Sequence, residues 1–148
     1  MIMEESKFNV NSSPCTSIEQ SKRLLALGLK KETADMKYHG LYLSSVDKWY
    51  NKEYPEVLYD GEQIHGKDIP AWSLHRLIEM MPTTIKSRYG YVNLTVNAEL
   101  VQYQYYDEDY MHNECCQHFN DGTLYDNIID CIEWLIKEGY FNKEYLER

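Results

Sequence analysis

The sequence predicts an α+β fold in which an antiparallel sheet packs against about three helices. One observation is a stretch from 92 to 105 in which apolar and polar residues alternate on both sides of a short turn, as in a β-hairpin. The other is three segments, near 16–28, 73–81 and 124–138, with apolar residues at helical spacing between capping residues. A sheet and amphipathic helices bury their apolar faces against each other, which gives the α+β class.

The length and composition fit one domain. The chain has 148 residues, of which 43% are hydrophobic and 26% are charged, both close to globular averages. We expect residues 15–148 to form this domain and residues 1–14, which are polar and without a period, to be a loosely ordered N-terminal arm. Residues 1–10 lack the basic and apolar parts of a signal peptide, and no apolar stretch reaches transmembrane length. We therefore expect a cytoplasmic protein that does not bind membranes.

The first helix is expected over 16–28. Thr16 and Glu19 have capping-box spacing, and Gly28 stands where a helix commonly ends. A further turn is expected within 30–36. Next, residues 41–46 and 57–59 favour two strands joined by a polar connection that contains Trp49.

The second helix is expected over 73–81, with Ser73 as N-cap and Pro82 as the residue that ends it. The 92–105 hairpin follows. Folding the chain about 97–100 places Val96 opposite Val101 and Leu94 opposite Tyr103, which gives the hairpin one apolar face.

Residues 107–121 are polar and predict irregular structure. The last helix, over 124–138, should begin at the N-cap Thr123 and end at Gly139, with Tyr140 folding back onto Leu135. It carries the longest apolar stripe, so we expect it to be the main partner of the sheet.

The net charge of −9 lies in one block. Residues 89–136 contain no Lys or Arg and nine acidic residues, while the rest of the chain has 15 basic and 15 acidic residues. A block of this sign repels nucleic acid and attracts basic partners, so direct nucleic-acid binding is unlikely. A solvated surface explains most such blocks. The candidate binding residues within it are Asp107, Glu108, Asp109 and Glu114.

One short segment combines several metal-ligand types. The weak candidates for zinc are His112, Cys115, Cys116 and His118. They crowd into seven residues and lack the separated pairs typical of structural zinc sites, so an ordinary polar strand or loop is the favoured interpretation. We expect no cofactor, because the sequence contains no phosphate-binding glycine loop and no recognised catalytic motif.

The thiols and tyrosines also have ordinary explanations. Cys131 falls on the apolar face of the last helix and Cys15 precedes the first helix, where we expect it to fill space. The 14 tyrosines outnumber three Phe and three Trp. Tyrosine suits both half-buried sheet faces and interfaces, and strand packing is the favoured interpretation because many of these residues fall in strand-like segments.

Three groups of segments together carry a resemblance to known proteins. They are CTSIEQS at 15–21 with TADM at 33–36, IPAWSL at 69–74 with LIEMMP at 77–82, and WLI at 134–136 with Gly139 and Tyr140. The set resembles small uncharacterised proteins of Bacteroides-type gut bacteria and their phages and mobile elements. The resemblance implies an intracellular accessory protein and assigns no activity.

The sequence leaves three functions open. The leading one is a non-catalytic protein-binding module, which is indicated by the resemblance, the tyrosines and the lack of catalytic motifs. The second is an inhibitor whose acidic block imitates a nucleic-acid backbone and occupies a basic groove on a nucleic-acid-binding protein. The third is a small metal-dependent enzyme that uses the 112–118 segment.

Overall fold

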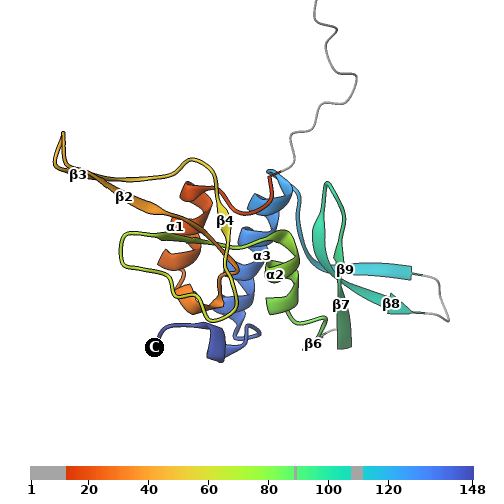
Figure 1. The fold of residues 1–148 in the computed structure, drawn as a ribbon. Coiled ribbons are helices and arrows are strands. Elements are labelled where there is room, and N and C mark those ends of the chain that lie inside the picture. The colour runs from red at the N-terminus through yellow and green to blue at the C-terminus, as the bar shows by residue number, and fades with distance from the viewer. Residues whose placement is uncertain (1–12, 89, 108–111) are drawn as a thin grey trace, which may run out of the picture.

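The computed structural model describes residues 13–88, 90–107 and 112–148, and only the backbone of 106–107 and 112–116. Its helices are α1 (Ile18–Ala26), α2 (Leu74–Met80) and α3 (Leu124–Glu138), with 3-10 turns η1 (Lys31–Thr33) and η2 (Lys143–Tyr145). The helices lie in the middle of the molecule, with a four-stranded sheet on one side and a long hairpin projecting from the other (Figure 1). This arrangement confirms the α+β class.

The strands form three antiparallel sheets within these described residues. The first has the order β4-β1-β5, made of β1 (Met36–Tyr38), β4 (Glu56–Val57) and β5 (Ile69–Ala71). The second is the projecting hairpin of β2 (Gly40–Leu43) and β3 (Lys48–Asn51). The third has the order β6-β7-β8-β9, made of β6 (Thr84–Ser87), β7 (Gly90–Val96), β8 (Val101–Asp107) and β9 (His112–Phe119).

The main core lies between α3 and the four-stranded sheet, as predicted. Ile128, Ile132 and Leu135 of α3 are fully buried and belong to the same cluster as Val101 and Tyr103 of β8. The β7–β8 register is the one predicted, with Leu94 opposite Tyr103 and Val96 opposite Val101. The alternation of apolar residues therefore decides both the register and the face that α3 covers.

Three of the predicted helix ends are confirmed. Ser73 and Thr123 accept hydrogen bonds from the N–H groups of Arg76 and Asp126, and Gly139 ends α3 with a φ of 78°. The Tyr140 N–H then donates to the Leu135 carbonyl over 2.8 Å, as the predicted fold-back requires. Because a left-handed φ favours glycine, Gly139 suits this position better than any other residue.

The predicted cap of the first helix is wrong. Ser17 is the N-cap, and it forms the capping box with Gln20. Thr16 is fully buried instead, and its hydroxyl lies 2.7 Å from the Ser21 hydroxyl and accepts the Trp72 N–H over 3.1 Å. The sequence spacing fits both boxes, and the contact with Trp72 of the neighbouring segment decides between them.

Two loop predictions are also wrong. Trp49 was expected in a polar connection, but it lies in β3 and pairs with Tyr42 of β2. Residues 107–121 were expected to be irregular, yet 112–119 form β9, which pairs with β8. Both strands break the simple apolar–polar alternation, since β3 carries adjacent aromatic residues and β9 is mainly polar. No helix among the described residues combines the length and the apolar character needed to span a bilayer.

Candidate functional site

The large hydrophobic side chains that face solvent are concentrated in one part of the chain. Among the described residues eleven are exposed, and nine of them fall between 41 and 59. We call these nine the 41–59 surface: Leu41, Tyr42, Leu43, Val46, Trp49, Tyr50, Tyr54, Val57 and Tyr59. Single exposed hydrophobic residues are common on proteins, whereas nine within one short segment are unusual.

Both faces of the β2–β3 hairpin contribute to this surface. Leu41 pairs with Tyr50 on one face, and Tyr42 pairs with Trp49 on the other, where their ring centroids lie 5.4 Å apart. The Lys67 ammonium lies 5.8 Å from the centre of the Trp49 ring, within the range of a cation–π contact. A two-stranded hairpin with both faces half in water is marginal on its own, so its base must hold it.

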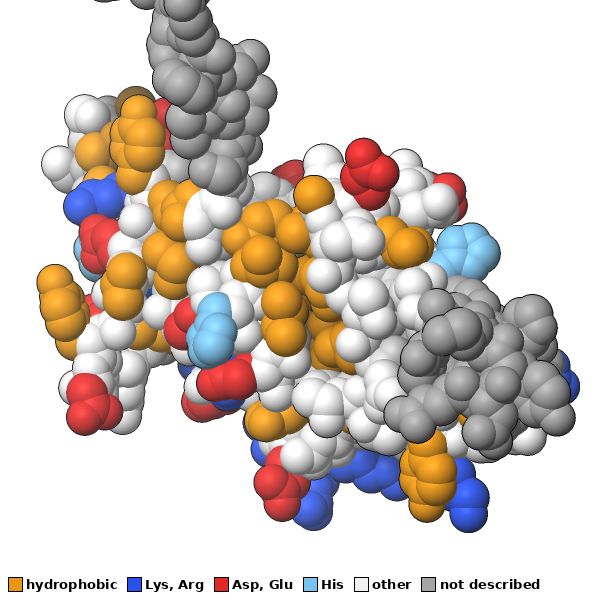
Figure 2. Space-filling model, turned by 90° about the vertical axis from the view of Figure 1, so that its right-hand side faces the viewer, with side chains coloured by type: hydrophobic (Ala, Val, Ile, Leu, Met, Phe, Trp, Pro, Cys, Tyr) orange, Lys and Arg blue, Asp and Glu red, His pale blue; other side chains and the backbone are white. Residues whose placement is uncertain are grey.

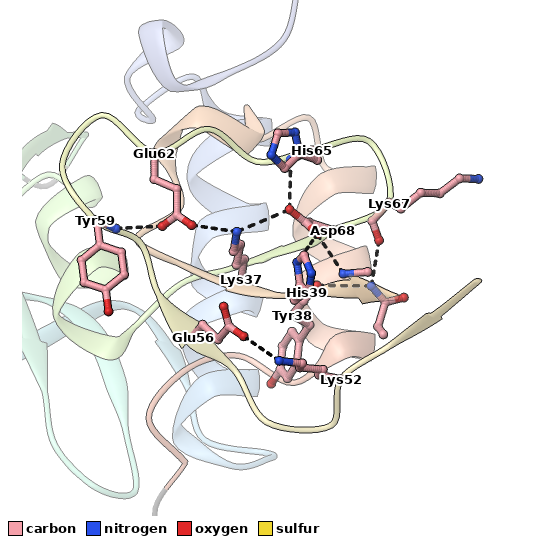
Figure 3. A network of polar contacts seen from close by, with 12 residues as sticks. Lys37, Tyr38, His39, Lys52, Glu56, Tyr59, Glu62, His65, Lys67 and Asp68 are labelled. Carbon is pink, nitrogen blue, oxygen red and sulfur yellow. Dashed lines mark hydrogen bonds and ion pairs between the residues drawn. The ribbon is translucent and has the colours of Figure 1, made fainter. Parts of the chain in front are cut away.

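That base is a buried charged cluster of Lys37, Asp68 and Glu62 (Figure 3). The Lys37 and Asp68 side chains are 5% and 2% exposed, and the Lys37 ammonium lies 3.7 Å from Asp68 Oδ2. It also donates to Glu62 Oε1 over 2.8 Å. Charges this deep are stable only when they are paired and hydrogen-bonded.

The protonation of the cluster follows from these contacts. Burial alone raises the pKa of the Asp68 carboxyl, but the N–H groups of Gly40 and His65 and the charge of Lys37 outweigh burial and hold the pKa below its ordinary value. The hydrogen bond to Glu62 raises the pKa of Lys37. Both groups are therefore charged at neutral pH.

Asp68 connects this cluster to the hairpin. Its Oδ1 accepts the Gly40 N–H over 2.8 Å at the first residue of β2, and His39 Nδ1 lies 3.2 Å from the same oxygen. On the other strand, the Asn51 amide donates to the carbonyls of Tyr38 and Lys67 (Figure 3). Gly40 is required here, since a Cβ would lie 2.5 Å from the Lys67 carbonyl oxygen. The hairpin is thus fixed at its base and exposed beyond it.

The predicted acidic site is only partly described. Asp107 ends β8 and Glu114 lies in β9, while Glu108 and Asp109 fall outside the described residues. Within the rest of the block, the Arg23 guanidinium of α1 lies 2.6 Å from Asp130 and 2.9 Å from Glu133 of α3. The hydrogen bond from Arg23 lowers the pKa of Glu133. Part of the block therefore joins two helices and is neutralised.

The predicted metal ligands lie on β9, and the structure describes the side chain of one of them. His118 is exposed and pairs with Gln102 of β8, whereas His112, Cys115 and Cys116 are described by backbone alone. Among the side chains that are described, no three His, Cys, Asp or Glu groups converge as metal ligands. The zinc site remains a prediction.

The two described cysteines are core residues, as expected. Burial raises the pKa of the Cys15 thiol despite its place before α1, and burial raises the pKa of Cys131 to about 12. Both side chains are fully buried. Neither is a reactive thiolate at neutral pH.

A hollow of about 630 Å³ lies where the N-terminal ends of the three helices meet. Its apolar lining includes Leu74, Leu124 and Tyr125, and a band of hydrophobic side chains runs across the middle of the molecule in Figure 2. The caps at its rim, Ser17 and Thr123, already accept hydrogen bonds from backbone N–H groups of their own helices. Each of these caps therefore satisfies one backbone donor of its own helix within the protein.

Sequence reasoning missed the 41–59 surface because it assigned the tyrosines to strand packing. Tyr42 and Tyr50 do lie in strands, but these strands are not packed against the core. One signal was present: Leu41, Tyr42 and Leu43 are consecutive apolar residues, as are Trp49 and Tyr50. A strand with apolar residues on both faces needs cover on both, and the described part of the chain leaves both faces of this hairpin exposed.

Comparisons with protein-family models, with curated proteins and with solved structures found no match for this chain.

Proposed function

We propose that this protein is a non-catalytic binding module that recognises another protein through the 41–59 surface. The observation that carries the proposal is the concentration of nine exposed hydrophobic residues, five of them aromatic, in 19 consecutive positions. Tyrosine and tryptophan are enriched at the centres of protein interfaces because each buries a large rigid ring and retains a polar group for hydrogen bonding.

The base of the hairpin supports this role. Asp68 and Asn51 hold the two strands by side-chain hydrogen bonds, so the aromatic residues are presented on an ordered ribbon. A preformed surface binds more tightly than a flexible one, since less conformational entropy is lost on association. The ribbon also projects from the body of the molecule, where a partner can reach both faces (Figure 1).

The resemblance to proteins of gut bacteria and their mobile elements indicates where this protein acts. We place the protein in the cytoplasm of a gut bacterium, as an accessory protein of phage or mobile-element origin. The acidic block is less suited to imitating nucleic acid than its sequence indicates, because Arg23 and Lys137 offset the charges of Asp130 and Glu133. The partner is therefore expected to bind through apolar contacts more than through charge.

The test is capture of partners from a Bacteroides-type lysate, with nuclease present and at both low salt and about 0.5 M salt, where the Debye length falls below about 5 Å. The double variant Trp49→Ser/Tyr50→Ser removes the centre of the surface. Tyr91→Ser is the matched control, since Tyr91 is 64% exposed on the opposite sheet. We expect a partner that survives nuclease and salt, is retained by the control and is lost from the double variant. A partner that dissociates in salt and still binds the double variant would support the acidic-block alternative instead.

A further inference from the structure

The backbone groups of β2 alternate between two sides, and two hydrogen bonds show which side each takes. The Lys52 N–H donates to the His39 carbonyl over 2.9 Å, so odd-numbered residues direct their backbone groups toward β3. The Gly40 N–H donates to Asp68 on the other side. By the alternation of an extended strand, the N–H and C=O of Tyr42 also point away from β3.

This outer edge of β2 is open. In the part of the chain that the structure describes, β3 is the only strand paired with β2, and every residue from 41 to 46 is exposed. Asp68 occupies the N–H of Gly40 on this edge, and Tyr42 is the next residue whose backbone N–H and C=O point outward. An unpaired edge is a template for another strand, because its hydrogen-bonding groups are already aligned.

The open edge also lacks the protection that such edges normally carry. Residues 40–46, GLYLSSV, contain no charged residue and no proline. The hairpin's other strand differs, since β3 carries Lys48 and is followed by Lys52. Natural proteins place lysine or proline on edges that must stay unpaired. This contrast indicates that the β2 edge, and not the β3 edge, pairs with another strand.

The edge is complementary to a second copy of itself. If two β2 strands run antiparallel with Tyr42 opposite Tyr42, each Tyr42 donates to and accepts from its counterpart. Leu41 of one copy then faces Leu43 of the other, so the pairs on both faces are aromatic–aromatic and aliphatic–aliphatic. Residues 40–46 of the paired strands carry no charged side chain, so the two strands do not place like charges opposite each other.

We propose that two copies of this chain pair along the outer edges of β2 to form a continuous four-stranded sheet with the order β3-β2-β2-β3. The dimer has two-fold symmetry, with the same surface used by both subunits. It goes beyond the proposed function, because it joins the 41–59 surfaces of two copies into one platform for a partner.

Cysteine cross-linking tests the register. In a background with Cys115→Ser and Cys116→Ser, the described native thiols, Cys15 and Cys131, are buried. Residues opposite each other in a hydrogen-bonded antiparallel pair have Cα atoms about 5.5 Å apart, which suits a disulfide. We expect Tyr42→Cys to form a covalent dimer on mild oxidation. Leu41→Cys, at a neighbouring residue of similar exposure, should not form one, because Leu41 of one copy lies opposite Leu43 of the other and not opposite the second Leu41. Equal yields from the two variants would overturn the proposal.

Sedimentation equilibrium of the purified chain at up to about 0.1 mM tests the edge itself. We expect a monomer–dimer equilibrium that persists in about 0.5 M salt. Tyr42→Pro removes the outward N–H from an edge position that tolerates proline, and should weaken association at least about tenfold. Tyr42→Thr removes the ring but retains the N–H, and should stay dimeric. A wild-type chain that is monomeric throughout overturns the dimer and leaves the capture experiment unaffected.

Discussion

The two hairpins of this protein contain the same cross-strand pair in opposite environments. In β7–β8, Leu94 pairs with Tyr103, and Tyr103 is fully buried. In β2–β3, Leu41 pairs with Tyr50, and the two residues are 39% and 45% exposed. Both pairs join a leucine to a tyrosine across an antiparallel ladder, so the two residue types alone do not decide whether the tyrosine is buried.

The difference comes from what lies opposite each hairpin. Helix α3 covers β8, where the Tyr103 ring lies 5.9 Å from that of Trp134 and its hydroxyl donates to the Pro82 carbonyl over 2.6 Å. The β2–β3 hairpin is instead anchored through Asp68 and the buried charges at its base. One hairpin is stabilised along its length and the other at one end, which leaves the second available for binding.

The largest expected effect is the loss of Tyr103. Tyr103→Ala leaves a cavity between β8 and α3 and an unpaired Pro82 carbonyl, and should lower the free energy of unfolding by about 4 kcal/mol. Urea denaturation followed by circular dichroism measures it. A change below about 1 kcal/mol would mean that α3 does not cover this hairpin as described.

A second substitution is directed at the base of the exposed hairpin. Asp68→Asn leaves Lys37 buried with Glu62 as its remaining partner and weakens the acceptor of the Gly40 N–H, at a cost of about 3 kcal/mol. Hydrogen exchange should then speed up in β2 and β3 more than in β7 and β8.

Asp60→Asn is the matched control for that experiment, since Asp60 is exposed in the same connection between β4 and β5. It should change neither stability nor exchange. If Asp68→Asn accelerates exchange equally in both hairpins, the carboxylate supports the whole fold and does not anchor β2–β3 in particular.

Acid should weaken the same base, by less than Asp68→Asn. The folded-state pKa of Asp68 lies below its ordinary value of about 4, so its contribution to stability is present above pH 4 and is lost as the pH falls through the lowered pKa. Lys37 shows the opposite pH dependence because its pKa is raised. Its contribution to stability is lost only as the pH rises above about 10.

Urea unfolding between about pH 2.5 and pH 7 measures this dependence. We expect a plateau near neutral pH and a decline below about pH 4, with a shallower decline in Asp68→Asn. Equal slopes for the two proteins would show that Asp68 is not the carboxylate responsible. The candidates would then be Glu62, Asp126 and Glu133, whose pKa values are also lowered.

The sequence predicted the parts of the fold in which local pattern and tertiary packing agree. The alternation around 97–100 gave the β7–β8 register, and Thr123 and Gly139 gave the bounds of α3. It failed where a distant contact decides, as at Thr16, whose hydroxyl accepts the Trp72 N–H. The candidate site was missed for the same reason. The consecutive apolar residues beside Tyr50 indicate that both faces of the strand need cover, but they do not show whether a helix provides it. The pairing of Lys37 with Asp68 joins residues 31 positions apart.

The smallest expected effect on stability is the loss of Tyr50 from the exposed hairpin. Tyr50→Ala removes the ring that pairs with Leu41, as Tyr103→Ala removes the ring that pairs with Leu94. Because Tyr50 is 45% exposed and outside the main core, we expect its loss to change the free energy of unfolding by about 0.5 kcal/mol or less in dilute protein. Tyr91→Ala, at an exposed position of β7, serves as the control. Capture of the partner should fall with Tyr50→Ala and persist with Tyr91→Ala, because the proposed function places Tyr50, and not Tyr91, in contact with the partner. A loss of several kcal/mol at Tyr50 would instead place it in a packed interior and remove it from the binding surface.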